Sequence, residues 1–269
     1  MFDFLEYLAK GEMTPGEQEL AYNLTVIYGM SILCMVVLYK LMYPTQTSKP
    51  EQEQKQVECD SLPSKEAALN LIKSRRSIMP KDLNGEEVTQ EEVDLLLEAA
   101  NWAPTHQRCE PWRYTVIQGG AGASDYLDRV EDWYSEHKEE ITDQEYQQFT
   151  RKIAGCKNVW PGKVSHLIII GMKRQALEDK RLPEWEEICA TAASVQNLHL
   201  ALTSIPGLGA FWSSHTWCRS WRDSAAMREF CGLEDEEDRV FGCMVIGRVD
   251  SDKSFKGHRR DLSEKVIWK

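Results

Sequence analysis

Two neighbouring arginines and a serine give this chain its first candidate for ligand chemistry. Arg75, Arg76 and Ser77 follow one another directly. A guanidinium group presents paired N–H donors that match a phosphate, and the serine hydroxyl adds another donor. An isolated Arg-Arg-Ser tripeptide is also typical of a helix end, where arginines meet the last carbonyl groups. The segment therefore predicts a phosphate site only if further ligand-binding residues accompany it.

Aromatic and polar side chains in two later segments are those further candidates. Trp102 and His106 lie on either side of a proline that ends a helix and turns the chain into a loop. Trp212, Ser213 and Ser214 belong to a short apolar run that is typical of a strand. An indole packs against flat rings, while histidine and serine donate hydrogen bonds. No Asp-His-Ser arrangement accompanies His106, so we assign no catalytic residue.

In chain order these segments resemble the nitroreductase family, most closely its compact bacterial NAD(P)H nitroreductases. The resemblance covers most of the chain. It rests on Arg75-Arg76-Ser77, Ala103-Pro104-Thr105-His106, Glu110-Pro111-Trp112-Arg113, Trp185 before Gln196-Asn197, Gly207 to Ser214, and Gly242 to Gly247.

The resemblance implies an α+β fold, with a central mixed sheet flanked by helices, in an intertwined homodimer. It implies FMN as cofactor and NADPH or NADH as co-substrate. Hydride would pass through the flavin to a nitro, quinone or similar small acceptor by a ping-pong mechanism. The residues implied to contact FMN are Arg75, Arg76, Ser77, Trp102, His106, Trp212, Ser213 and Ser214, with the His106 loop coming from the partner subunit.

Two positions depart from the family pattern. Arg108 stands where many family members have an asparagine beside the flavin, and Ser213 replaces a basic residue. Lys256, Arg259 and Arg260 are candidates to supply charge at the phosphate, although a solvated basic cluster is the alternative.

Local patterns predict the elements that must position these residues. Thr89 and Glu92 form a capping box that begins a helix. Short strands are predicted over 113–117, 166–170, 210–214 and 241–246, with 264–268 as a fifth, which in the family crosses to the partner. The helix over 185–203 has an apolar seam and a small-residue face, which suits a dimer helix or a monomeric core helix. The aromatic stretch 126–160 is either a substrate lid or two amphipathic helices.

An N-terminal appendage precedes the domain. Residues 1–20 are acidic, and residues 21–43 predict a transmembrane helix because the uncharged run would span about 28 Å as a helix. Residues 44–63 are predicted to form a polar tether, and residues 64–269 are predicted to form the nitroreductase domain. Lysines after the span favour a single-pass membrane protein whose catalytic domain faces the cytoplasm. A buried core helix is the alternative for 21–43.

Composition excludes several other functions. A formal net charge of -11 disfavours nucleic acid as a partner. The 8 cysteines and 6 histidines show no metal-ligand spacing, so no metal site is expected. No Gly-rich dinucleotide fingerprint follows a strand.

Two rival functions remain on the sequence alone. One is a membrane-anchored iodotyrosine deiodinase, but the Glu, Tyr and Lys spacing of the deiodinase lid is missing here. The other is a scaffold that kept the fold and lost turnover.

Overall fold

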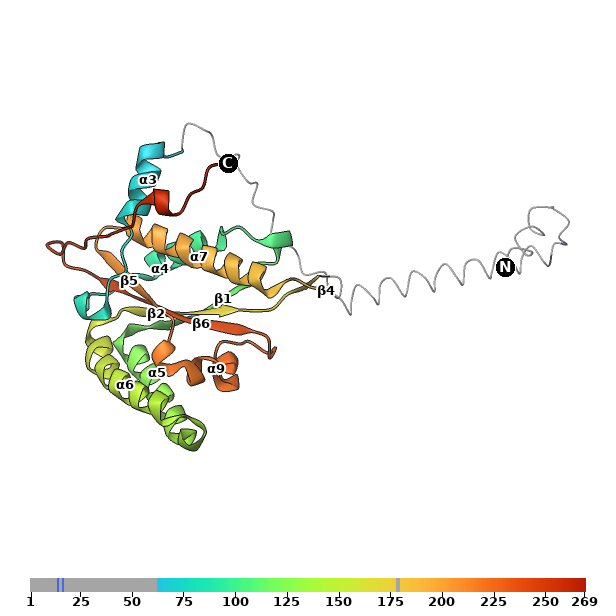
Figure 1. Ribbon diagram of the computed structural model, residues 1–269. Coiled ribbons are helices and arrows are strands. Elements are labelled where there is room, and N and C mark those ends of the chain that lie inside the picture. The colour runs from blue at the N-terminus through green and yellow to red at the C-terminus, as the bar shows by residue number, and fades with distance from the viewer. Residues whose placement is uncertain (1–13, 15, 17–61, 178–179) are drawn as a thin grey trace. The chain divides into compact units, whose positions relative to one another are not determined.

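The computed structural model describes Thr14, Gly16, residues 62–177 and residues 180–269 (Figure 1). Residues Pro63–Lys269 form a compact unit by themselves. The predicted N-terminal segments, 1–20, 21–43 and 44–63, lie outside the described residues apart from Thr14, Gly16 and the last two positions of the tether.

An antiparallel sheet of four strands lies at the centre of this unit, in the order β1-β2-β6-β5. The strands are β1 (Trp112–Gln118), β2 (His166–Met172), β5 (Leu208–Ser213) and β6 (Arg239–Arg248). The predicted α+β class is confirmed. The predicted mixed sheet is wrong, because every pairing within this sheet is antiparallel. A hairpin of β3 (Ala176–Leu177) and β4 (Lys180–Arg181) forms a separate small sheet.

The predicted fifth strand at 264–268 is not formed. That segment follows the 3-10 turn η6 (Leu262–Glu264), and the side chains of Ile267 and Trp268 are 84% and 92% exposed. A strand needs a neighbour for its backbone hydrogen bonds, and within the described part of this chain the segment pairs with no strand.

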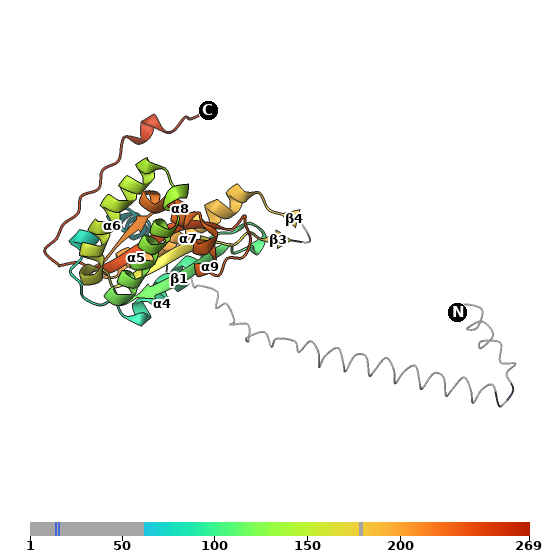
Figure 2. The same cartoon turned by 90° about the horizontal axis from the view of Figure 1, so that it is seen from below.

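Helices cover both faces of the sheet (Figures 1 and 2). The long helices α4 (Gln90–Asn101) and α7 (Glu184–Ser204) lie on one face, and α3 (Lys65–Ser74) packs against α7. The other face carries α5 (Gly119–Glu136), α6 (Asp143–Lys163), α8 (Arg219–Arg222) and α9 (Ala225–Phe230). Short 3-10 turns are η2 (Pro80–Asp82), η3 (His106–Arg108), η4 (Lys138–Glu140) and η5 (Thr216–Cys218).

Alternation along β2 divides the core between these layers. Leu167 and Ile169 join the cluster under α5 and α6, whereas Ile168 and Ile170 join the cluster under α4 and α7. Successive side chains of a strand point to opposite faces, so a strand buried on both sides reads as a continuous apolar run.

The predicted helix start at Thr89 is confirmed. The Thr89 hydroxyl accepts from the Glu92 backbone N–H at 3.3 Å, and the Glu92 carboxylate accepts from the Thr89 N–H at 2.9 Å. This capping box satisfies two N–H groups that a helix start leaves without partners.

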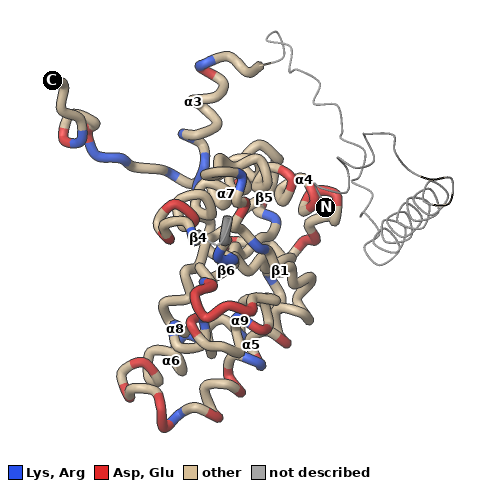
Figure 3. Tube along the Cα trace, turned by 90° about the vertical axis from the view of Figure 1, so that its right-hand side faces the viewer, with Lys and Arg blue, Asp and Glu red and all other residues tan. Residues whose placement is uncertain are grey.

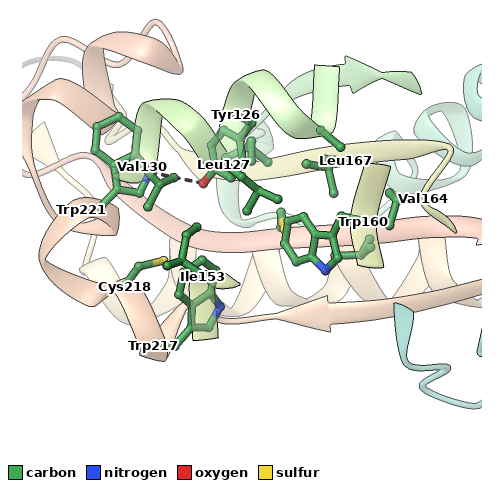
Figure 4. Close-up of a cluster of buried hydrophobic side chains, with 14 of the residues drawn as sticks. Tyr126, Leu127, Val130, Ile153, Trp160, Val164, Leu167, Trp217, Cys218 and Trp221 are labelled. Carbon is green, nitrogen blue, oxygen red and sulfur yellow. Dashed lines mark hydrogen bonds between the residues drawn. The ribbon is translucent and has the colours of Figure 1, made fainter. Parts of the chain in front are cut away.

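The aromatic stretch 126–160 forms paired helices. Tyr134 of α5 stacks on Phe149 of α6 with ring centroids 3.8 Å apart, and both rings are buried. Figure 4 shows neighbouring members of the same cluster, where Trp221 donates its indole N–H to the Tyr126 hydroxyl at 3.3 Å. These contacts fit the two-helix interpretation and not the lid, because the aromatic rings are part of the core.

The predicted membrane localisation is wrong. Among the described residues, no helix combines the length and the apolar character that crossing a bilayer requires. The 21-residue helices α6 and α7 are long enough, but both carry charged side chains; α7 begins with Glu184, Glu186 and Glu187. The predicted span itself, residues 21–43, lies outside the described residues. The expectation of a single-pass protein facing the cytoplasm is withdrawn.

Candidate functional site

A single backbone hydrogen bond brings two of the predicted segments together. The Ile78 N–H donates to the Ala210 carbonyl oxygen at 2.8 Å, which ties the segment after α3 to β5. An added Cβ on Gly209 would lie 3.2 Å from the Ile78 side chain, so the two backbones pack closely. Ser77 and Trp212 are each within two residues of this bond at one edge of the sheet, and both side chains are exposed.

Arg75 has a partly buried guanidinium group with neutral partners. Its Nη1 donates to the Ser77 hydroxyl at 3.4 Å and faces the His199 Nδ1 at 3.5 Å. Burial, Arg259 and Arg76 lower the pKa of Arg75 from its ordinary value. Arginine nevertheless stays charged at any ordinary pH.

The charges around Arg75 are unbalanced. In the part of the chain that the structure describes, no ion pair links a carboxylate to Arg75, Arg76 or Arg259. We call Arg75, Arg76, Ser77, His199 and Arg259 the Arg75 cluster. Concentrated positive charge without a protein counter-ion favours an anionic ligand.

Arg76 uses its guanidinium group differently. Its Nε donates to the Phe255 carbonyl at 2.9 Å, and its Nη1 donates to the carbonyls of Lys73 and Arg75. These bonds hold the C-terminal segment against the end of α3, where Figure 3 shows basic residues of both segments side by side. An added Cβ on Gly257 would lie 2.7 Å from this guanidinium carbon. Arg76 is therefore mainly a clamp between two segments.

The end of β5 alternates between exposed and buried side chains. Trp212 is 38% exposed, and its indole N–H donates to the Phe241 carbonyl at 2.9 Å. Ser213 is buried, and Ser214 is exposed. The Ser214 carbonyl accepts from Arg222 Nη1 at 3.0 Å. Ser213 thus faces the core, while Trp212 and Ser214 face outward.

A groove of about 560 Å³ borders this end of β5. Its lining joins η2, α6 and β5 and includes Trp212, Ser213 and Ser214. Three cationic side chains also line it, namely Lys81, Arg151 and Lys152. The groove therefore combines an aromatic wall with positive charge.

A bulge in β6 shapes the backbone at Ser213. Gly242 has φ +89°, and an added Cβ would lie 1.9 Å from the Ser213 carbonyl oxygen. The pairing of β6 with β2 shifts register between Ile169 and Gly171, which is opposite this position. Bulges of this kind bend a strand and often adjoin functional sites. Here only glycine lets β6 approach the Ser213-Ser214 backbone so closely.

Behind Ser214, His215 is fully buried in a left-handed conformation with φ 53°. Its Nε2 lies 3.2 Å from the Cys243 Sγ, and its Nδ1 lies 3.4 Å from the Tyr126 hydroxyl. Burial and the charge of Arg222 lower the pKa of His215 to about 3, so the ring is neutral at pH 7. These contacts fix the turn that follows β5.

Trp102 and His106 lie at the other end of α7. The His106 Nδ1 is 3.6 Å from the Glu186 carboxylate in the first turn of α7. Trp102 is 67% exposed, and its indole N–H donates to Glu98 at 2.8 Å. Neither residue is in the Arg75 cluster.

The loop around His106 has a strained backbone. Gln107, Arg108 and Glu110 have φ of 49°, 57° and 40°, a conformation that costs energy for residues other than glycine. The Thr105 hydroxyl contacts the Cys109 Sγ at 2.9 Å and accepts from the Glu110 N–H at 3.1 Å. We call residues 105–110 the His106 loop.

Helix α7 separates the two sets of predicted residues. Glu186, beside His106, and His199, beside Arg75, are 13 positions apart on α7. At 1.5 Å per residue this is about 20 Å. Within one chain, the Ile78–Ala210 bond joins the segment that carries Arg75, Arg76 and Ser77 to the strand that carries Trp212 and Ser213, whereas His106 lies beside the opposite end of α7.

Comparison with known proteins identifies the family. The sequence profile described as "Nitroreductase family" matches residues 72–248, which is more than half of the chain. The chain belongs to the nitroreductase family. Among curated proteins, "Putative NAD(P)H nitroreductase YfhC" of Bacillus subtilis is 26% identical over 168 residues, covering 62% of this chain and 77% of YfhC.

Solved structures show the same nitroreductase fold. A nitroreductase-like family protein from Bacillus cereus has 24% identity and a TM-score of 0.57, covering 77% of this chain and 98% of its own. A nitroreductase with bound FMN from Bacteroides fragilis has 18% identity and a TM-score of 0.55, covering 75% of this chain and 98% of its own. A further neighbour, from Sphigopyxis, is described as an FMN and NADPH-dependent nitroreductase.

Sequence reasoning missed two residues of the candidate site. In the sequence, His199 is one position on the apolar face of the helix predicted over 185–203. A polar ring on an apolar face was the available signal that this residue has a specific partner. Gly242 was read only as part of a strand, although a glycine inside a strand pattern is a signal for a bulge.

Proposed function

We propose that this protein is an FMN-dependent oxidoreductase that takes hydride from NADPH or NADH and reduces a nitro, quinone or similar small acceptor. The observation that carries the proposal is the Arg75 cluster, which lies beside β5 in a chain of the nitroreductase family. Solved relatives with this fold hold FMN.

The charge and chemistry of the cluster fit the cofactor. FMN carries a phosphate with two negative charges, and Arg75 and Arg259 supply positive charge with no carboxylate partner in the described chain. The Ser77 hydroxyl is an exposed donor beside them. Trp212 offers an aromatic surface for a flat ring at the same edge of the sheet.

The chain's own groups bind and orient rather than exchange protons. Arg75 would hold the phosphate of FMN, and Arg76 holds the C-terminal segment so that Arg259 stays near Arg75. The bulge at Gly242 and the buried His215 fix the backbone of Ser213 and Ser214 along which the ring would lie. Bound FMN would supply the hydride chemistry in two half-reactions, with donor and acceptor using one place in turn.

The proposed site needs a second copy of the chain. Trp102 and His106 lie about 20 Å along α7 from Arg75. Side chains at Trp185, Ile188, Cys189 and Ala192 are exposed along α7. If two α7 helices packed antiparallel about a two-fold axis, the His106 loop of one copy would approach the Arg75 cluster of the other. The exposed Ile267 and Trp268 would then cross to the partner, as the family resemblance implies.

The visible spectrum of the full-length protein tests this function. FMN is added, excess is removed, and spectra are recorded without oxygen before and after NADPH or NADH, then after air is admitted. We expect a flavin absorption band that bleaches when the nucleotide reduces the flavin and returns when oxygen reoxidises it. A protein that binds FMN but keeps its colour with both nucleotides is a scaffold, and a protein that binds no FMN contradicts the proposal.

A further inference from the structure

His199 is a polar residue in an otherwise apolar part of the core. It lies on α7 among Val195, Leu198 and Leu202, and only 5% of it is exposed. Buried histidines need partners for both ring nitrogens. Both nitrogens of His199 face the Arg75-Arg76 segment.

The contacts determine which ring nitrogen carries the proton. Nε2 lies 2.9 Å from the Arg76 carbonyl oxygen, which only accepts, so Nε2 must carry the hydrogen. Nδ1 lies 3.5 Å from Arg75 Nη1, which only donates, so Nδ1 must present its lone pair. The ring is therefore neutral and bridges a backbone carbonyl and a guanidinium group.

We propose that His199 is a positioning residue that holds the Arg75 guanidinium toward the phosphate of FMN without neutralising its charge. This inference rests on the proposed function and adds to it a residue outside the predicted flavin contacts. His199 acts through Arg75 and touches no ligand itself.

A neutral partner has a physical advantage at this position. A carboxylate would also orient Arg75, but it would form an ion pair and compete with the phosphate for the guanidinium donors. The imidazole accepts one N–H of Arg75 and leaves the other donors for a ligand.

The surroundings keep the ring neutral. Burial and the charge of Arg75 lower the pKa of His199 to about 4, against the opposing effect of the Arg76 carbonyl. The charged groups that face this contact are Arg75 and Arg76 from the segment after α3 and Arg259 from the C-terminal segment. All three are cations, and the charge of Arg75, which contacts the ring, disfavours an imidazolium.

Affinities for FMN and riboflavin separate positioning from general structure, because riboflavin lacks only the phosphate. The variants are His199→Gln, which offers a donor and an acceptor, His199→Leu, which offers neither, and His199→Glu, which adds a carboxylate. In His199→Leu we expect the ratio of FMN affinity to riboflavin affinity to fall about tenfold. This factor corresponds to the free energy of one charge-assisted hydrogen bond. His199→Gln should stay within about threefold of wild type. His199→Glu should lose more preference than His199→Leu.

Riboflavin affinity is the internal control for misfolding, and His137→Leu, at the residue that follows α5, is the matched histidine control. Equal losses of FMN and riboflavin affinity in His199→Leu would show a merely structural histidine and overturn the proposal. A wild type that prefers FMN, with an unchanged preference in His199→Leu, would overturn this inference alone. A wild type that binds neither flavin would overturn both this inference and the proposed function.

Nitrogen chemical shifts of the full-length wild-type protein test the tautomer of His199. The measurement needs no ligand and no substituted protein. With ¹⁵N-labelled histidine at pH 7, the His199 ring should show a protonated Nε2 and a bare Nδ1. An imidazolium, or a ring protonated at Nδ1, would contradict the proposed contact with Arg75.

Discussion

The Ile78 N–H donates to the Ala210 carbonyl oxygen at 2.8 Å, and this bond determines where the first predicted motif lies. It continues the edge of β5 with the segment after α3. Ser77 and Trp212 are each within two residues of this bond, although 135 positions of sequence separate them. The two predicted segments are joined here because the edge strand needs a backbone partner.

Arg75 and Arg76 should respond differently to alanine substitution. Arg75→Ala removes a guanidinium group that has no carboxylate partner, so we expect an unchanged fold and FMN binding about 10- to 100-fold weaker. Arg76→Ala breaks bonds to the carbonyls of Lys73, Arg75 and Phe255, so we expect a loss of about 1–2 kcal/mol in the free energy of unfolding.

Flavin titration and urea unfolding measure these two quantities. Arg129→Ala, on α5 at the other face of the sheet, is the matched control. It should change neither the FMN affinity nor the free energy of unfolding strongly. Wild-type FMN affinity in Arg75→Ala would remove this residue from the site.

Gly242→Ala should destabilise the protein strongly. The residue has φ +89°, and the new Cβ would lie 1.9 Å from the Ser213 carbonyl oxygen, so the β5 and β6 backbones must separate. We expect a loss of at least about 2 kcal/mol in thermal or urea unfolding. Gly155→Ala in α6 is the matched control, because its Cβ meets nothing within 4 Å and alanine favours a helix. Equal stability of the two variants would mean that the β6 backbone at Gly242 does not approach Ser213 closely.

Glu145 should make stability fall in acid. Burial opposes its charge, but hydrogen bonds from Ser220, Tyr134 and Arg219 lower the pKa of Glu145 to about 2. The folded-state pKa lies below the unfolded value of about 4.3, so the stabilisation is complete above pH 5 and is lost as the pH falls toward 2. The difference between these two pKa values corresponds to about 3 kcal/mol.

Urea unfolding at several pH values measures this contribution. Glu145→Gln should be less stable than wild type at pH 7 and should lose less stability between pH 5 and pH 2. Glu139→Gln, at an exposed position, should follow the wild-type curve. If Glu145→Gln also follows it, Glu145 does not contribute as described.

Local sequence patterns predicted the elements better than their pairing. The capping box at Thr89 and the four strands depend on neighbouring residues, and the structure confirms them. The direction of strand pairing and the fate of residues 264–268 depend on partners far along the chain or in a second subunit. Spacing alone carries no such information.

The candidate site was predictable as a set of motifs but not as a geometry. The sequence treats Arg75 and Arg76 alike, whereas the structure gives the donors of Arg76 to backbone carbonyls. Sequence spacing placed His199 on a helix face and could not show that the face meets Arg75. The family resemblance supplied the idea that His106 belongs to a second subunit.

A mixed dimer tests most directly the proposal that Arg75 of one chain and His106 of a second copy complete one flavin site. Arg75→Ala and His106→Ala chains are tagged separately, and the dimer that contains one of each is isolated for FMN titration. Two-fold symmetry puts both substitutions in one of its sites and leaves the other intact. We expect this dimer to bind FMN with wild-type affinity at about half the wild-type flavin content. Two equally weakened sites, with no recovery over either parent variant, would contradict it.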